Sequence, residues 1–509
     1  MQCPECGNEN PDDAQVCKSC SSALATRDTQ QSKQKAKTGV MVVCAAGLAG
    51  LSCILAILIK PTLAFLAALF GFCSAIAAIA KFLRSERKAK RTTIAIGIVV
   101  LIFSSLQMLI LTYWRIDAAP IPNDYTINDI RSAAPEYNQT YTLLNSLSDD
   151  NDDATDALAI GLSKEDLKNL EEINNIFKED DLRTISEQLQ ANADNILSIW
   201  QNAKKGRDVL VKLDSFPEIA DLTVPKLEID VPFAPNLRRL AFLHRSYVCL
   251  QSSKGNHENV INELTRCDSI FKKMSLNAHS LITRLVCIAC FAIDIQTTNF
   301  IINNPETPHE LLWFLKQHIV PFSEEHTSLR NSMIFEYLIC KNELTKISND
   351  PRLRHPIFSP LKLNSALRLY RNICDKWIAI EENRTHIKEL RVWPALYPNL
   401  PVKIDSEGKL PWYYKIYNPV GAKTIAILTP AMDRVISIRT RLEVHSDLLQ
   451  ILLNKRLGRE VSLKARAYSD EYIVDTENRK IFSPGPDGRI NTKDDIKLRI
   501  NPDVLGWRN

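Results

Sequence analysis

Four cysteines near the N-terminus have the residue type and the spacing to do chemistry. Cys3, Cys6, Cys17 and Cys20 form two C-x2-C pairs separated by ten residues. Two close pairs of thiolates can complete a tetrahedral zinc site. Because all four ligands are thiols, such a site is closed and structural, with no coordination position left for a substrate. The sequence therefore predicts a small zinc ribbon over residues 1–24.

This segment is too short to have a hydrophobic core, so metal binding would have to fold it, at roughly 10–16 kcal/mol in small zinc peptides. Gly7 follows the first pair and permits a tight turn, whereas Ser21 follows the second. The alternative interpretation is that the cysteines form disulfides or are spaced by chance.

The stretch resembles the short zinc ribbon at the N-terminus of many bacterial membrane proteins. The matching positions are Cys3-Pro4, Cys6-Gly7, Asn10-Pro11, Ala14 and Cys17 through Cys20. The resemblance implies a cytoplasmic ribbon whose partner is generally unknown.

A second candidate metal site lies near the C-terminus. Asp487, Asp494 and Asp495 lie within nine residues, close to Gly485 and Gly488. Calcium takes six to eight oxygen ligands on a flexible loop, with glycine at the sharp bend. The alternative is a polar β-turn in which the aspartates cap backbone amides.

This C-terminal run resembles the terminal loop of type II secretion pseudopilins, which holds calcium. The resemblance implies that Asp487, Asp494 and Asp495 are calcium ligands. The pseudopilin N-terminal processing site is absent from this chain, so the likeness is confined to the terminal hairpin.

Three uncharged apolar runs follow the ribbon, over residues 39–59, 62–80 and 93–113. About 20 apolar residues in a helix span the hydrocarbon core of a bilayer. The sequence therefore predicts a three-helix transmembrane module over 39–114, joined to the ribbon by a basic linker over 25–38. The module resembles one that carries varied soluble domains in bacterial membrane proteins.

Basic residues in short loops predict the orientation of these spans. The loop 81–91 holds six Lys or Arg residues and one Glu. Together with the basic linker, this loop predicts a cytoplasmic N-terminus, a multi-pass protein of the bacterial inner membrane, and an extracytoplasmic segment 117–509. Anionic lipid explains the basic segments better than nucleic acid does, and the net charge of +4 gives no argument for nucleic acid.

The remainder predicts a multi-domain, mostly α-helical outer part. We expect a polar, loose lead-in over 115–160, a helical domain over 161–392, and a C-terminal subdomain over 393–509 with a long helix and a β-hairpin. The apolar stretch 285–293 predicts a buried central helix, and its Cys287 and Cys290 predict core thiols instead of a redox motif.

Catalytic motifs are missing from the sequence: it has no G-x-S-x-G, no H-E-x-x-H and no phosphate-binding glycine loop. The sequence therefore favours a non-enzymatic interaction or scaffold protein of the cell envelope, with an unknown envelope protein as partner. The alternative is a hydrolase-like envelope enzyme whose site is assembled from residues distant in sequence.

Overall fold

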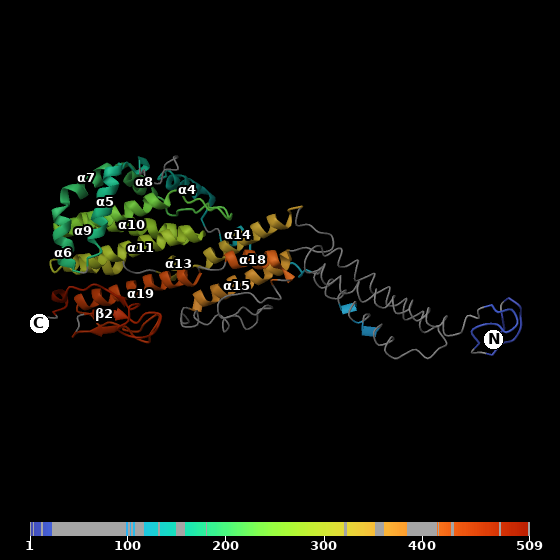
Figure 1. Ribbon diagram of the computed structural model, residues 1–509. Coiled ribbons are helices and arrows are strands. Elements are labelled where there is room, and N and C mark those ends of the chain that lie inside the picture. Colours follow the sequence, from blue (N-terminus) through green and yellow to red (C-terminus); the bar gives the residue numbers. More distant parts are fainter. Residues whose placement is uncertain are drawn as a thin grey trace. The chain divides into compact units, whose positions relative to one another are not determined.

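The computed structural model describes part of the chain (Figure 1). The described residues are 2–22 without 4, 12 and 13; 98, 99, 102, 105 and 106; 117–148 without 131 and 132; 158–319 without 180; 323–351; 361–383; 415–428 without 416; and 432–506 without 478 and 479. The chain divides into one unit of residues 1–118 and 348–362 and a second of residues 119–347 and 363–509.

The second unit, called the helical unit below, is mostly α-helical, as the sequence predicts. Its helices of eight residues or more are α4 (Asn138–Asn145), α5 (Lys164–Ile176), α6 (Leu182–Ala191), α7 (Ala193–Asn202), α8 (Lys204–Asp214), α9 (Ala234–Ser253), α10 (His257–Asn277), α11 (Leu281–Ile302), α14 (Arg330–Ser348), α15 (Leu363–Asn383), α18 (Pro419–Leu428) and α19 (Met432–Arg456). Short turns join them: η1 (Ile127–Asp129), η2 (Pro135–Tyr137), η3 (Leu158–Ile160), α12 (His309–Phe314), the π-helical η4 (Leu315–Ile319), α13 (Glu324–Thr327) and η6 (Pro502–Leu505).

Local capping chemistry sets several of these boundaries. Ser163 and Asp166 form a capping box at the start of α5, each side chain accepting from the other's backbone amide. Gly458, with φ +65°, ends α19. Its amide donates to Lys455 O and the next amide donates to Asn454 O, which is the Schellman arrangement.

The sequence pattern over 257–300 predicts one continuous helix, and this prediction is wrong because the chain breaks between α10 and α11. The buried carboxylate of Asp221 accepts from the amides of His279 and Ser280 at 3.1 and 3.2 Å. Ser280 then caps α11 by accepting from the amide of Thr283. A residue 58 positions away in sequence therefore fixes a break that helical periodicity does not reveal.

Helix α11 is the buried centre of the helical unit, as the sequence predicts. It packs against α9, α10 and α19, and Figure 1 shows it between these elements. Cys287 and Cys290 are both buried, and burial raises the pKa of the Cys287 thiol to about 12. Core thiols with raised pKa values are poor nucleophiles.

By length and composition, α11 is also the one helix among the described residues that could cross a membrane, and 72% of its most apolar window is buried inside the protein. The three predicted spans lie outside the described residues, apart from positions 98, 99, 102, 105 and 106 of the third, which are helical.

The lead-in, expected to be loose, is folded over its described residues, which are 117–148 without 131 and 132, and 158–160. Asp124 forms an ion pair with Lys341 of α14, with 2.8 Å between Oδ2 and Nζ. The hydroxyl of Tyr125 donates to Asp375 of α15 at 2.8 Å. Polar composition predicts solvation, but here the polar side chains serve as anchors to distant helices.

A three-stranded antiparallel sheet lies near the C-terminus, in the order β1 (Ile473–Asp475), β2 (Lys480–Ser483), β3 (Ile496–Lys497). The predicted hairpin is confirmed, with Val474 opposite Ile481. The third strand, which the sequence analysis missed, pairs Lys497 with Phe482. Helix α19 packs against β2, β3 and α11, so elements from the two predicted outer domains contact one another.

A buried ion-pair cluster, called the Arg439 clamp below, joins three parts of the helical unit. Arg439 of α19 donates to Glu381 of α15 at 2.9 Å and to Glu443 of α19 at 3.0 Å. Glu443 also accepts from the hydroxyl of Thr327, and Glu381 accepts from the amide of Leu329. The side chains of the three ionic residues are 2–3% exposed.

We predict that Arg439→Met destabilises the protein by roughly 3–5 kcal/mol, because it leaves two carboxylates buried without their cation. The free energy of unfolding, measured by chemical denaturation, tests this. Arg441→Met, at an exposed position of the same helix, is the matched control and should change that energy by about 0.5 kcal/mol or less. Equal effects of the two substitutions would contradict the prediction.

A second buried charge has no such compensation. Asp294 of α11 is 3% exposed, and neither of its carboxylate oxygens has a hydrogen-bond partner among the described residues. Burial raises the pKa of this carboxyl well above its usual value, with the charge of Asp268 acting in the same direction. Folding therefore favours the protonated acid.

We predict that Asp294→Leu, which keeps the shape of the side chain, stabilises the protein by about 1–3 kcal/mol at neutral pH. Because its folded-state pKa is raised, the contribution of Asp294 to stability is fully present below the unfolded pKa of about 3.9 and is lost as pH rises. The advantage of the Leu variant should grow with pH above about 4. Chemical denaturation at a series of pH values measures this difference in unfolding free energy, and Asp194→Leu, at an exposed position, is the control. A difference between Asp294→Leu and wild type that shrinks as pH rises would refute the prediction.

Candidate metal centre

The four predicted thiols come together. The Sγ atoms of Cys3 and Cys20 are 3.5 Å apart, as are those of Cys6 and Cys17. All four sulfur atoms lie within 4.8 Å of one another. Thiolates bound tetrahedrally to zinc at about 2.3 Å have sulfur atoms about 3.8 Å apart. The four sulfur positions therefore fit a tetrahedral site with four cysteine ligands, and the cysteines are free thiols instead of disulfides.

Two equivalent backbone turns hold the pairs. In the first, the amide of Gly7 donates to Cys3 O and the amide of Cys3 donates to Asn8 O, both at 2.9 Å. In the second, the amide of Ser21 donates to Cys17 O and the amide of Cys17 donates to Ser22 O, again both at 2.9 Å. The first turn requires φ +71° at Gly7, and the second requires φ +58° at Ser21. The second turn therefore carries the backbone strain of a left-handed serine.

Asn10 joins the two turns, a role that the cysteine spacing does not reveal. Its buried side chain donates to Asn8 O at 3.0 Å and to the sulfur of Cys17 at 3.4 Å. Its oxygen accepts from the amide of Lys18 at 3.1 Å. Outer hydrogen bonds of this kind orient metal ligands and tune their basicity.

The electrostatics of the site favour a bound cation. The backbone amide of Ser19 lowers the pKa of the Cys17 thiol to about 6. At Cys6 the amide of Asn8 lowers the pKa, but the thiols of Cys20 and Cys17 outweigh it and raise the pKa to about 12. Four thiolates at this separation repel one another, so a dication is needed to hold all four deprotonated.

Apolar packing contributes little to this segment. The buried apolar cluster of the ribbon consists of Cys3 and Cys17, with Ala14 packed against them. Because the four thiols themselves are the core, a bound metal would couple metal binding to the folding of this segment.

The C-terminal aspartates contact the protein's own groups. Asp487 accepts from the amide of Arg489 at 2.8 Å, and Asp494 accepts from the amide of Asp487 at 3.0 Å. Asp495 instead lies 3.4 Å from Lys497. Within the part of the chain that the structure describes, the four-cysteine group is the one cluster suited to a metal. Calcium at this loop has no support, and Asp487 and Asp494 cap backbone amides, which is the alternative left open above.

Comparison with protein-family models, with curated proteins and with solved structures finds no match for this chain. The assignment of the site therefore depends on its own geometry, and the resemblances noted in the sequence stay predictions.

The two turns predict opposite effects of two small substitutions. Ser21→Gly removes the strain of the left-handed serine, about 1 kcal/mol, and should tighten zinc binding roughly fivefold. Gly7→Ala introduces the same strain and should weaken zinc binding by a similar factor, since no atom lies within 4 Å of the new Cβ and sterics add nothing.

Competition with a chromophoric zinc chelator measures both effects. Ser19→Gly is the matched control, because Ser19 is exposed and is not among the residues with positive φ. Tighter binding by Ser19→Gly than by Ser21→Gly would contradict the strain argument.

Proposed function

We propose that the chain is a zinc-ribbon protein anchored in the bacterial inner membrane, whose large helical unit binds a protein partner outside the cytoplasm. The observation that carries the proposal is the succession of parts along one chain. A closed four-thiol site is followed by three uncharged apolar runs and then by an extensively folded helical unit.

The zinc has a structural role in this proposal. Four thiols complete a tetrahedral shell, so no coordination position is left for water or substrate. The ribbon is then a rigid module held at the cytoplasmic face, where it can present its exposed side chains to a partner.

Membrane anchoring is supported by the described positions of the third apolar run. Ile98, Val99, Ile102 and Leu106 are helical, and each side chain is between 48% and 63% exposed. Large apolar side chains exposed at helical positions are unfavourable in water and favourable in hydrocarbon.

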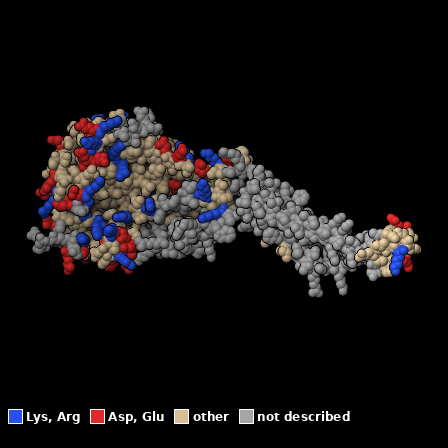
Figure 2. All heavy atoms as spheres, in the orientation of Figure 1, with Lys and Arg blue, Asp and Glu red and all other residues tan. Residues whose placement is uncertain are grey.

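The surface of the helical unit supports a protein partner over a nucleic acid. Figure 2 shows Lys and Arg side chains interspersed with Asp and Glu on the visible face. Nucleic-acid binding surfaces instead gather basic residues on one face. The visible surface of this unit is therefore of mixed charge, which suits a protein partner better than a nucleic acid.

We predict that protease added to intact spheroplasts removes a C-terminal epitope and spares an N-terminal one. The reason is that the basic loop 81–91 stays in the cytoplasm and fixes the orientation of the spans. Immunoblotting with both tags measures the result, and inverted membrane vesicles should give the opposite pattern. Loss of the N-terminal epitope from intact spheroplasts would refute the orientation.

Crosslinking in intact cells, followed by purification through the helical unit and mass spectrometry, tests the interaction role. Recovery of envelope proteins that are lost with a surface substitution of this unit supports the proposal. Catalytic turnover that depends on a residue of this unit would overturn it.

A further inference from the structure

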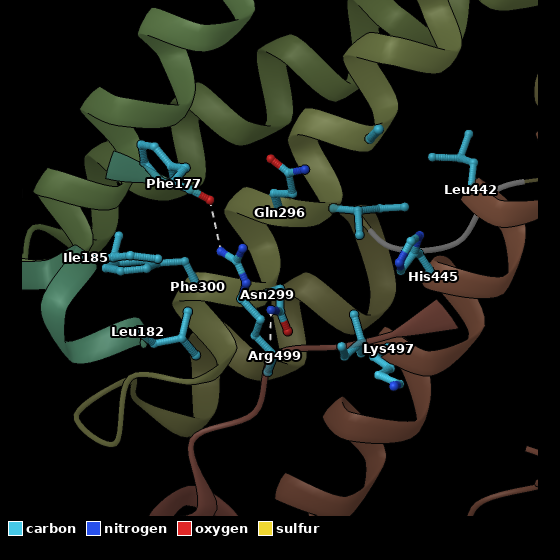
Figure 3. A pocket seen from close by; sticks show the side chains of 13 residues that line it. Phe177, Leu182, Ile185, Gln296, Asn299, Phe300, Leu442, His445, Lys497 and Arg499 are labelled. Atoms are coloured by element: carbon cyan, nitrogen blue, oxygen red, sulfur yellow. Dashed lines mark hydrogen bonds between the residues drawn. The ribbon is translucent and has the colours of Figure 1, made fainter. Parts of the chain in front are cut away.

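A cavity of about 270 Å³ that opens to solvent lies in the helical unit, bounded by residues from five segments, and its lining residues Gln296 and Lys497 are exposed (Figure 3). One wall is apolar and consists of Phe177, Leu182 and Ile185. The opposite side comes from α11, α19 and β3, more than a hundred residues away in sequence. The volume is close to the small end of the range for ligand pockets, roughly 300–1,000 Å³.

The charges that line this cavity are of one sign. Lys497 and Arg499 line it, and none of its thirteen described lining residues is Asp or Glu. Lys497 lies 3.4 Å from Asp495, and Arg499 donates to the carbonyl of Phe177 at 2.9 Å. Burial lowers the pKa of the lining His445 to about 4, so this ring is neutral at physiological pH. The cavity therefore combines an apolar wall with cationic groups.

A third cation lies directly behind the lining. Arg245 is 3% exposed, and burial lowers its pKa only to about 10, so it is charged at neutral pH. Its Nη1 donates to Gln296 Oε1 at 2.5 Å, its Nη2 donates to Asn174, and its guanidinium lies 3.8 Å from the ring of Phe177. Its guanidinium also lies 5.4 Å from the ring of Phe242, so its partners are two amides and two rings, with no carboxylate from the described residues.

A buried cation without a carboxylate is costly, at several kcal/mol of desolvation. Gln296 and Phe177 contact Arg245 on one side and line the cavity on the other. Because Gln296 Oε1 accepts from Arg245, the amide N–H groups of Gln296 remain as donors. An anion in the cavity would accept hydrogen bonds from those N–H groups and would lie close to the positive charge of Arg245.

We propose that this cavity binds a small monocarboxylate with an apolar body. The carboxylate lies by Gln296 and Arg499, and the body packs against Phe177, Leu182 and Ile185. This site is separate from the metal centre and is independent of the proposed membrane orientation.

Isothermal titration of the full chain in lipid nanodiscs tests the proposal, with 4-phenylbutyrate and octanoate as probes. We expect saturable binding of these acids above the signal from protein-free nanodiscs. The neutral 4-phenylbutanamide should bind roughly tenfold more weakly, and 4-phenylbutylamine should not bind, because the cavity selects for negative charge.

Two variants keep the test independent of folding. Gln296→Glu supplies an internal carboxylate for Arg245, so the melting temperature should be kept or raised while acid binding falls roughly tenfold or more. Gln190→Glu, an exposed position of α6, is the matched control and should leave binding unchanged. Ala292→Leu fills the cavity without removing any hydrogen bond and should also abolish binding.

Failure of both acids to bind saturably would overturn the proposal. Equal binding by the acid and the amine would also overturn it, as would wild-type acid binding in a folded Gln296→Glu variant.

Discussion

The Arg439 clamp is the constraint on which the arrangement of the helical unit depends. One guanidinium holds a carboxylate from α15 and a carboxylate from its own helix, and these carboxylates in turn accept from the segment that joins α13 to α14. Arg284 of α11 is also buried. Burial lowers the pKa of its guanidinium, and the negative charge of the clamp residue Glu381 partly raises it again. Buried ions tolerate few alternative geometries, because any arrangement that separates them leaves a charge unsolvated.

The clamp fixes α19, and α19 positions most of the C-terminal part. The same helix carries Arg439 and Glu443 toward the clamp and Leu442 and His445 toward the cavity. The left-handed backbone conformation of Gly458 ends this helix, and the chain then continues to the sheet that packs against α19. The register of β3 then places Lys497 and Arg499 at the cavity. The cavity is thus a consequence of how the C-terminal part of the chain returns onto α11.

The ribbon achieves order by a different route. Its buried apolar cluster consists of Cys3 and Cys17 with Ala14 packed against them, and its geometry comes from two repeated backbone turns, one bridging asparagine and four thiols. A bound dication would balance the repulsion among the four thiolates, so metal binding would complete both the site and the fold of this segment. The helical unit instead depends on an extensive apolar core with a few buried charges at its junctions.

Features that depend on near neighbours in the chain could be predicted from the residues alone. The four-cysteine cluster, the α5 capping box, the Gly458 terminus, the first hairpin and the buried α11 all follow from short spacing or local periodicity. The break between α10 and α11, the docking of Asp124 and Tyr125, the clamp and the cavity emerge only when the chain is folded. Each of these is made by side chains 50 or more residues apart, and a polar residue in sequence does not reveal whether water or a distant partner will satisfy it. The C-terminal aspartates show the same limit of sequence-based prediction. Their spacing suits a calcium site as well as a capped turn, whereas in the folded loop the carboxylates of Asp487 and Asp494 accept hydrogen bonds from backbone amides.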